Sequence, residues 1–315
     1  MRKYYVPVLA ICLFFVIMCY TSLFAGDISL SGEVREESLA FGGMQRTYLA
    51  YIPSGKLSSP ALIVVLHGSL GTGQKMRKAS AFQFDRLADS KKCIVVYPDG
   101  YKNHWNDCRT VPTDAAHTMN IDDVGFISAL IEACTTKWHI DAARVFVAGL
   151  SNGGHMCFRL ASEIPGQIAG IVAIGASMPV AGMSKCPAAK AGIPVIIMNG
   201  TDDPINPYDG GMVKLLHFYK KGEVLSSLDS ARAWLKAESS NAESVTVQVK
   251  DKDPQDGSYV EIKSWPGSPV RLYTIKGGGH TIPGGKQYLP GFIVGKVNRD
   301  INTAEEMWNF FNRTE

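Results

Sequence analysis

The sequence predicts an α/β protein: a three-layer sandwich in which helices cover both faces of a mostly parallel central sheet, with an antiparallel hairpin before it. Short apolar runs alternate with segments of helical periodicity, which is typical of consecutive β-α-β units. Two strand-like segments joined by a Gly-Gly pair precede them. A Gly-x-Ser-x-Gly sequence at residues 149–153 lies between an apolar run and a helical segment, the strand-turn-helix context of an exposed nucleophile.

Length and composition indicate one globular domain. The 315 residues are 46% hydrophobic and 19% charged, which is enough apolar material for a large core. No Pro-rich stretch, low-complexity segment or internal repeat divides the chain. We therefore expect a single catalytic domain over residues 26–315, after a removable segment at residues 1–25.

The N-terminal segment has the features of a secretory signal peptide. Two basic residues precede an apolar stretch at residues 4–20, and Thr21, Ser22 and Ala25 are small residues in the segment that follows, although Leu23 is a poor residue for the third position before a cut. The alternatives are an uncleaved membrane anchor, because the stretch is nearly long enough to span a bilayer, and a lipoprotein cut before Cys19, which the large Met18 disfavours. Cleavage after Ala25 predicts a secreted protein without stable membrane association.

The elements are expected in the following order. The hairpin lies at residues 32–41 and 44–52. Buried strands are expected at residues 61–66, 94–97, 144–148, 169–174 and 194–198, and helices between them at residues 75–91, 122–138 and 152–164. A helix at residues 225–239, strands at residues 244–250, 259–265 and 271–275, and a closing helix at residues 303–312 complete the chain. The irregular segments 99–120 and 176–193 are long for connectors, so we expect them to form active-site walls.

Ser151 is the candidate nucleophile. A sharp strand-to-helix turn crowds the positions on either side of the serine, and Gly149 and Gly153 have no side chain to collide there. The strained turn holds the hydroxyl outward. Because a serine hydroxyl is a weak nucleophile at neutral pH, the chain must also supply a base, a group that orients the base, and donors for the oxyanion.

His280 is the expected base. It lies in a glycine-rich stretch, residues 277–285, directly after a predicted strand, and a loop there would carry the imidazole above the edge of the sheet. His217 also follows Ser151 at a distance, but its surroundings are those of an ordinary structural residue. His67 ends a predicted strand before the serine, so we expect it to brace the loop that begins there.

The acid is expected directly after the strand at residues 194–198. In this kind of fold the acid follows the serine and precedes the histidine in the chain. Spacing does not separate Asp202 from Asp203, because one carboxylate can brace the turn while the other accepts a hydrogen bond from the imidazole. Asp209 is a third candidate and is more typical of a turn residue.

Two backbone N–H groups are candidates for the oxyanion hole. The N–H of Asn152, directly after the nucleophile, is one donor, and the loop that follows the strand at residues 61–66 should give the other. We choose Ser69 in that loop. Trp105 is the candidate substrate-binding residue because it lies in the long segment 99–120, although a single tryptophan in a loop is about as often a packing anchor.

Cysteine usage fits an oxidising compartment with at most two disulfides. Residues 26–315 contain an odd number of cysteines, so at least one thiol is left over. Cys108 and Cys186 lie in loop-like segments and are the better candidates for a bridge. Cys157 lies on the helix after the serine and has the character of a small buried residue. The sequence does not pair Cys93 or Cys134.

Several other chemistries lack support in the sequence. There is no H-E-x-x-H or paired C-x-x-C spacing, so we expect no metal and no cofactor. The glycines at residues 68–73 are followed by Gln-Lys-Met, where a phosphate-binding loop needs Lys and then Ser or Thr. The net charge of +3 falls to +1 when Arg2 and Lys3 are removed, and no basic stripe indicates nucleic-acid binding.

Six stretches together are specific: residues 66–68 (LHG), 122–126 (DDVGF), 149–154 (GLSNGG), 199–204 (NGTDDP), 253–257 (DPQDG) and 277–285 (GGGHTIPGG). With them the chain resembles the secreted polyhydroxybutyrate depolymerase-like and feruloyl or acetyl-xylan esterase group of the α/β-hydrolase superfamily, from about residue 43 to residue 311. The resemblance implies the triad Ser151, Asp203 and His280. It also implies a serine esterase that cleaves hydroxyalkanoate oligomers, or feruloyl, acetyl or other short acyl esters, through an acyl-enzyme.

The chain departs from that group at three positions. Ile282 stands where tryptophan is common, Asn199 where histidine is common, and Asn206 where an apolar residue is common. The acyl pocket is therefore expected to differ in shape, which leaves the natural ester open between small and oligomeric substrates. A serine peptidase and a catalytically silent secreted binding protein are the alternative functions; a silent protein would usually lack a triad residue.

Overall fold

The computed structural model describes residues 30–111, 114–215, 219–237 and 242–312. Contacts divide the chain into two units, Met1–Ser31 and Gly32–Glu315, and every helix and strand described below lies in the second. The expected signal peptide at residues 1–25 and the histidine at position 217 lie outside the described residues. Within those residues no helix is both long and apolar enough to cross a bilayer.

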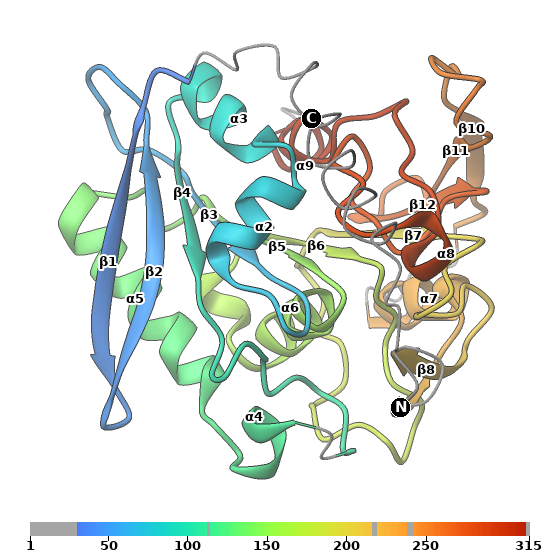
Figure 1. Ribbon diagram of the computed structural model, residues 1–315, viewed down its shortest axis with the longest axis horizontal. Helices are drawn as coiled ribbons and strands as arrows, with labels where there is room; N and C mark the ends of the chain where they lie inside the picture. Colours follow the sequence, from blue (N-terminus) through green and yellow to red (C-terminus); the bar gives the residue numbers. More distant parts are fainter. Residues whose placement is uncertain (1–29, 112–113, 216–218, 238–241, 313–315) are drawn as a thin grey trace, which may run out of the picture. The chain divides into compact units, whose positions relative to one another are not determined.

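The strands form one large sheet and a separate two-stranded hairpin (Figure 1). The order in the large sheet is β1-β2-β4-β3-β5-β6-β7-β12-β11-β10, with parallel neighbours from β4 to β12 and antiparallel pairs at both edges. The strands are β1 (Glu33–Phe41), β2 (Met44–Ile52), β3 (Leu62–Leu66), β4 (Ile94–Pro98), β5 (Val145–Leu150), β6 (Gly170–Ile174), β7 (Val195–Gly200), β8 (Gly211–Leu215), β9 (Tyr219–Val224), β10 (Val245–Gln248), β11 (Tyr259–Ser264) and β12 (Val270–Lys276). The predicted mostly parallel sheet and its N-terminal hairpin are confirmed.

Helices cover both faces of this sheet. Helices α5, α6 and α7 share one apolar cluster with one face, whereas α2, α3 and α9 lie over the other, where Phe146 of β5 packs against Trp308 and Phe311. The helices are α2 (Gly73–Ala79), α3 (Gln83–Lys91), α4 (Ala115–Thr118), α5 (Asp123–Trp138), α6 (Asn152–Glu163), α7 (Ser227–Ala237), α8 (Gly291–Val294), α9 (Thr303–Phe311) and the 3₁₀ turn η1 (Pro165–Gln167). This is the expected three-layer sandwich.

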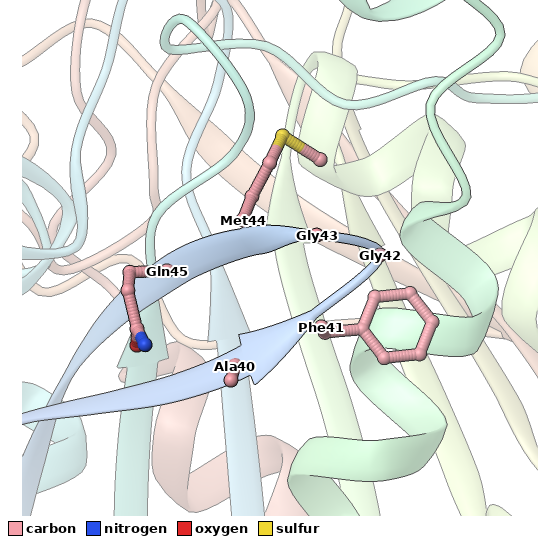
Figure 2. Close-up of a pocket in the computed structure, with 6 residues that line it drawn as sticks. All are labelled: Ala40, Phe41, Gly42, Gly43, Met44 and Gln45. Carbon is pink, nitrogen blue, oxygen red and sulfur yellow. The ribbon is translucent and has the colours of Figure 1, made fainter.

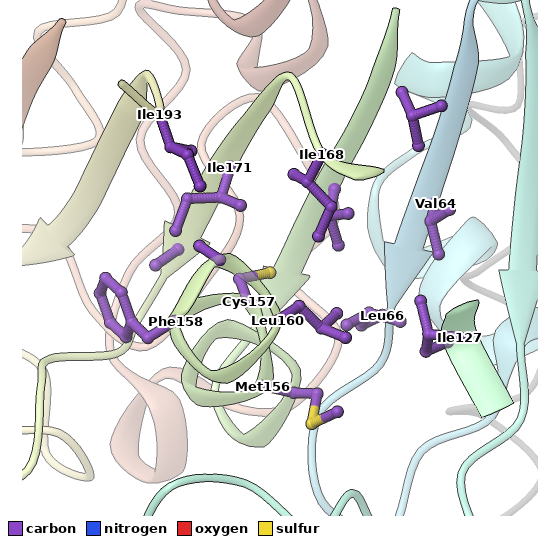
Figure 3. Close-up of a cluster of buried hydrophobic side chains, with 14 of the residues drawn as sticks. Val64, Leu66, Ile127, Met156, Cys157, Phe158, Leu160, Ile168, Ile171 and Ile193 are labelled. Carbon is purple, nitrogen blue, oxygen red and sulfur yellow. The ribbon is translucent and has the colours of Figure 1, made fainter. Parts of the chain in front are cut away.

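The core explains why the central strands read as continuous apolar runs. All residues of β3, β4, β5, β6 and β7 are buried because each of these strands has helices on both faces. Each large apolar side chain buried in this way contributes about 2 kcal/mol to folding. Figure 3 shows part of the cluster between the sheet and helix α6, including Val64, Leu66, Ile127, Met156, Cys157, Phe158, Leu160, Ile168, Ile171 and Ile193.

The structure differs from the predicted elements in one helix and in several short elements that were not predicted. The single helix expected at residues 75–91 is two helices, because Ala81 and Phe82 adopt left-handed backbone conformations, with φ of 52° and 60°, that end α2 and begin α3. The β8–β9 hairpin and the short helices α4 and α8 were not expected from the sequence. The hairpin lies against the segment after β6, where Val180 N–H donates to the Glu223 carbonyl at 3.1 Å.

One disulfide joins the two long irregular segments. Cys108 and Cys186 are bonded, which confirms these two as the bridge members. Cys93, Cys134 and Cys157 are buried free thiols, and burial raises the pKa of Cys93 and of Cys134 to about 12. Because a thiolate is the reactive form, these two cysteines are inert packing residues.

Candidate active site

The turn between β5 and α6 holds Ser151 in a strained backbone conformation. Its φ and ψ are 56° and −118°, and a positive φ is uncommon for a residue with a Cβ atom. Such a conformation costs about 1–3 kcal/mol and persists only where the surrounding structure enforces it. Here the Ser151 N–H donates to the Ile174 carbonyl at the end of β6, at 2.7 Å. The strained turn expected at this serine is present.

The glycines of the motif are required by space. A Cβ atom on Gly149 would lie 2.3 Å from the Gly153 carbonyl oxygen, and one on Gly153 would lie 2.5 Å from the Leu66 carbonyl oxygen. Both distances are far inside van der Waals contact, so the strand and the helix could not approach this closely with any other residue. The predicted steric reason for the two glycines is therefore confirmed.

Asp203 and His280 meet directly although they are far apart in the sequence. The His280 Nδ1 lies 2.7 Å from the Asp203 Oδ2, and both side chains are almost fully buried. An ionised carboxylate only accepts hydrogen bonds, so Nδ1 is the donor in this pair. The His280 main chain is fixed on both sides, because its N–H donates to the Val294 carbonyl and its carbonyl accepts from the Tyr288 hydroxyl.

The structure separates the two adjacent aspartates. The other oxygen of Asp203 accepts hydrogen bonds from the N–H groups of Ile205 and Asn206 at 2.8 and 2.9 Å, which fixes the carboxylate toward the imidazole. Asp202 is exposed and its carboxylate accepts from the neighbouring Thr201 hydroxyl at 3.0 Å. Asp203 alone of the two therefore contacts the histidine.

Ser151 and His280 approach the same point at the end of β6. The imidazole lies against Gly175, where an added Cβ atom would be 3.0 Å from both its Cε1 and its Nδ1 atoms, and the preceding carbonyl is the one that binds the Ser151 N–H. The Ser151 hydroxyl makes no hydrogen bond with the residues that the structure describes. In hydrolases without substrate the hydrogen bond between the serine hydroxyl and the histidine is often long, and it tightens only when substrate binds.

The two segments that contain the expected oxyanion donors both adjoin the serine. A Cβ atom on Gly68 would lie 3.3 Å from the Ser151 Cβ, so the loop that contains Ser69 passes directly beside the nucleophile. Asn152 begins helix α6, and the first N–H groups of a helix have no partner within it. Over the described residues, the N–H groups of Ser69 and Asn152 donate to no protein acceptor.

Trp105 does not line an open surface. Its side chain is 0% exposed, and its indole Nε1 donates to the His67 carbonyl at 2.9 Å. The expected substrate-binding role is therefore replaced by a packing role beneath the site. The sequence signal was ambiguous, since a tryptophan in a loop serves either purpose.

His67 braces its loop, as expected. Its ring is buried, with Nε2 accepting from the Gly100 N–H at 2.9 Å and Nδ1 2.7 Å from the Gly68 carbonyl. Burial lowers the pKa of His67 from 6.5 to about 4, against a smaller opposing effect of the Gly68 carbonyl. The residue is therefore neutral at physiological pH.

This pKa predicts an acid-dependent loss of stability. Below pH 6.5 the unfolded chain binds a proton at His67, whereas the folded chain binds it only near pH 4. Protonation therefore favours the unfolded chain, so the free energy of unfolding is full above pH 6.5 and falls as the pH drops from 6.5 to about 4. From pH 7 to pH 5 the loss from His67 is about 2 kcal/mol. We expect the free energy of unfolding of His67→Gln, measured with urea, to fall correspondingly less over this pH range than that of the wild type. Equal losses in the two proteins would contradict the assignment.

Comparison with known sequences identifies the family. The sequence profile of the phospholipase/carboxylesterase family matches residues 49–222, which is more than half of the chain. The chain belongs to this family. It is therefore a carboxylesterase-type hydrolase, and the strained serine and the buried Asp-His pair lie in a fold that such enzymes use.

Individual relatives of this carboxylesterase-family chain are also esterases by name. It is 28% identical over 281 residues to "Putative esterase NocK" of Nocardia uniformis subsp. tsuyamanensis, covering 85% of this chain and 79% of that protein. It is 26% identical over 248 residues to feruloyl esterase B of Piromyces equi, covering 76% of this chain but only 44% of that protein. The acetyl xylan esterase of Aspergillus awamori superposes with a TM-score of 0.60 at 16% identity, over 89% of this chain and 99% of that one, which shows the shared fold.

A separate hollow lies at the tip of the β1–β2 hairpin (Figure 2). It is lined by the end of β1, the Gly-Gly turn and the start of β2: Ala40, Phe41, Gly42, Gly43, Met44 and Gln45. Strands β2, β4 and β3 separate β1 from β5 in the sheet. The hollow therefore offers no titratable group and no access to the carboxylesterase-family serine.

Proposed function

We propose that this protein is an exported serine esterase that cleaves carboxylic esters through an acyl-enzyme on Ser151, with His280 as the base and Asp203 as the group that orients it. The observation that carries the proposal is the buried 2.7 Å hydrogen bond between His280 and Asp203, beside the strained serine. The disulfide supports export, because such bonds persist in oxidising compartments.

In the proposed reaction the Ser151 oxygen attacks the ester carbonyl carbon while its proton passes to the His280 Nε2. Asp203 stabilises the imidazolium that forms. The carbonyl oxygen becomes an oxyanion, which accepts hydrogen bonds from the N–H groups of Ser69 and Asn152. The tetrahedral intermediate then expels the alcohol, which takes the proton from His280, and the acyl group remains on the serine.

Deacylation repeats these steps with water. His280 removes a proton from a water molecule, the resulting hydroxide attacks the acyl-enzyme carbonyl, and the same two N–H groups hold the second oxyanion. Collapse releases the carboxylic acid and returns the proton to Ser151.

The proposed substrates are hydroxyalkanoate oligomers, or feruloyl, acetyl and other short acyl esters. Asn199, one of the positions where the chain departs from the esterase group it resembles, hydrogen-bonds the Ala176 main chain and the Ser177 and Ser227 hydroxyls.

A substrate comparison with the purified protein tests the proposal. We expect hydrolysis of short p-nitrophenyl esters. We also expect a higher kcat/KM on one of three other substrates, methyl ferulate, an acetylated xylo-oligomer or hydroxybutyrate oligomers, and the substrate with the highest value assigns the natural class of ester. Labelling of Ser151 by a fluorophosphonate, read by mass spectrometry, reports the activated serine directly. No turnover of any of these esters and no labelling would overturn the proposal in favour of a silent binding protein.

A further inference from the structure

Trp105 joins the two chain segments that flank the nucleophile. Its indole N–H donates to the main-chain carbonyl of His67, at the end of β3. Its own main chain pairs with the side-chain amide of Asn152, at the start of α6: the Trp105 N–H donates to Oδ1 at 2.8 Å, and the Trp105 carbonyl accepts from Nδ2 at 2.9 Å. Trp105 is thus hydrogen-bonded both to His67 and to Asn152, one in each of the two segments beside Ser151.

Both of these residues are themselves fixed. The His67 ring lies tilted against the indole, with ring centroids 5.0 Å apart and an interplanar angle of 38°, and its Nε2 accepts from the Gly100 N–H. On the other side, the Asn152 amide also donates to the Asp107 carboxylate at 2.7 Å. Burial favours the neutral form of Asp107, but Arg109 and His117 outweigh it and hold the pKa of this carboxyl well below its usual value. The anchor is therefore a carboxylate.

This arrangement bears on catalysis because each of the two segments carries one proposed oxyanion donor. The Ser69 N–H follows His67 in the same loop, and the Asn152 N–H belongs to the residue whose amide Trp105 holds. Both N–H groups must lie about 2.7–3.1 Å from one oxygen position, and errors of about 0.5 Å in such a site reduce its effect.

We propose that Trp105 is a positioning residue that sets the separation between the Ser69 and Asn152 N–H groups. The inference rests on the proposed function and adds to it a residue that touches neither substrate nor the reacting atoms. It predicts that loss of the indole hydrogen bond weakens binding of the oxyanion rather than binding of the substrate, because the ground-state ester makes little use of these donors.

The informative variant is Trp105→Phe, which keeps an aromatic ring and the main-chain pairing but removes the N–H that holds the His67 carbonyl. Trp234→Phe is the matched control. Trp234 is also a buried tryptophan, 1% exposed, and its indole nitrogen has no hydrogen-bond partner among the described residues. The two variants therefore lose the same atoms, and only one loses a hydrogen bond.

The readout is inhibition by an aryl trifluoromethyl ketone together with the kinetics of a p-nitrophenyl ester. The serine oxygen adds to the ketone carbon, its proton passes to His280, and the carbonyl oxygen becomes an oxyanion in the same position as that of the ester intermediate. For Trp105→Phe we expect kcat/KM to fall about tenfold and the inhibition constant to rise about tenfold, with KM unchanged. Trp234→Phe should stay within about twofold of the wild type in both.

Equal values for the two variants would overturn the inference. So would a fall in kcat for Trp105→Phe with unchanged ketone affinity, because that pattern indicates fewer folded molecules and not a displaced donor. If Trp105→Phe does not fold, Asn152→Ala replaces it: this variant keeps the backbone N–H and loses the amide that Trp105 holds, and the same parallel change is expected. Fluorophosphonate labelling of the wild type distinguishes failure of the positioning role of Trp105 from failure of the proposed function, since an absence of labelling overturns the proposed function itself.

Discussion

Replacement of Ser151 by alanine is expected to lower kcat about a million-fold, because positioning and oxyanion binding cannot replace a missing nucleophile. The substitution keeps the Cβ atom, so the strained φ of 56° and the hydrogen bond from the residue 151 N–H to the Ile174 carbonyl are unaffected. The fold should therefore remain intact. Turnover of p-nitrophenyl acetate, with circular dichroism and thermal unfolding to confirm folding, measures the effect.

Ser162 provides a control on the same helix. It is a buried serine near the C-terminal end of α6. Ser162→Ala makes the same change as Ser151→Ala, the loss of one hydroxyl, at a position remote from the turn. We expect its kcat to match the wild type and its fluorophosphonate labelling to be unchanged. A folded Ser151→Ala protein that kept one per cent of the wild-type rate would assign the nucleophile to another residue.

The sequence was most informative where local sterics and chain order fix the structure. The glycines around Ser151 predicted a close strand-helix contact, and the structure shows backbone oxygens 2.3 and 2.5 Å from the positions that Cβ atoms on Gly149 and Gly153 would take. The glycine-rich loop after β12 predicted a histidine above the sheet edge, and His280 lies there against Gly175. Parallel strands end at one edge, so loops that follow them meet even when they are far apart in the chain.

The sequence was least informative where a long-range contact decides the local conformation. Residues 75–91 contain no glycine or proline, so the sequence gives no sign of the break that the structure shows at Ala81 and Phe82. The break instead places Gln83 so that its side chain donates to the Pro283 carbonyl of the histidine loop at 3.1 Å. A partner 200 residues away cannot be read from helical periodicity.

Trp105 illustrates the same limit within the site. Its loop position suggested contact with substrate, whereas its hydrogen bonds face His67 and Asn152 beneath the nucleophile. Asp107, two residues later, was not singled out at all, although it anchors the Asn152 amide. A single loop carboxylate has no periodic or motif signal, and its role depends on which residues the fold brings to it.

Asp203→Asn is expected to lower kcat about 10⁴-fold, because the substitution changes the tautomer of His280. The amide oxygen can still accept from the N–H groups of Ile205 and Asn206, so the amide nitrogen is directed at the imidazole. Two donors then face each other unless His280 moves its proton from Nδ1 to Nε2. In that tautomer Nε2 can no longer accept the proton of the serine.

Asp202→Asn is the matched comparison, since it makes the same chemical change one residue away on an exposed side chain that contacts Thr201. We expect it to change kcat by less than about threefold, because the lost charge is exposed to solvent and no hydrogen bond to the imidazole is altered. The kcat of the two purified variants on one p-nitrophenyl ester decides the matter. The reverse order of effects would mean that the carboxylate 2.7 Å from His280 is a structural brace and that its exposed neighbour orients the base during turnover.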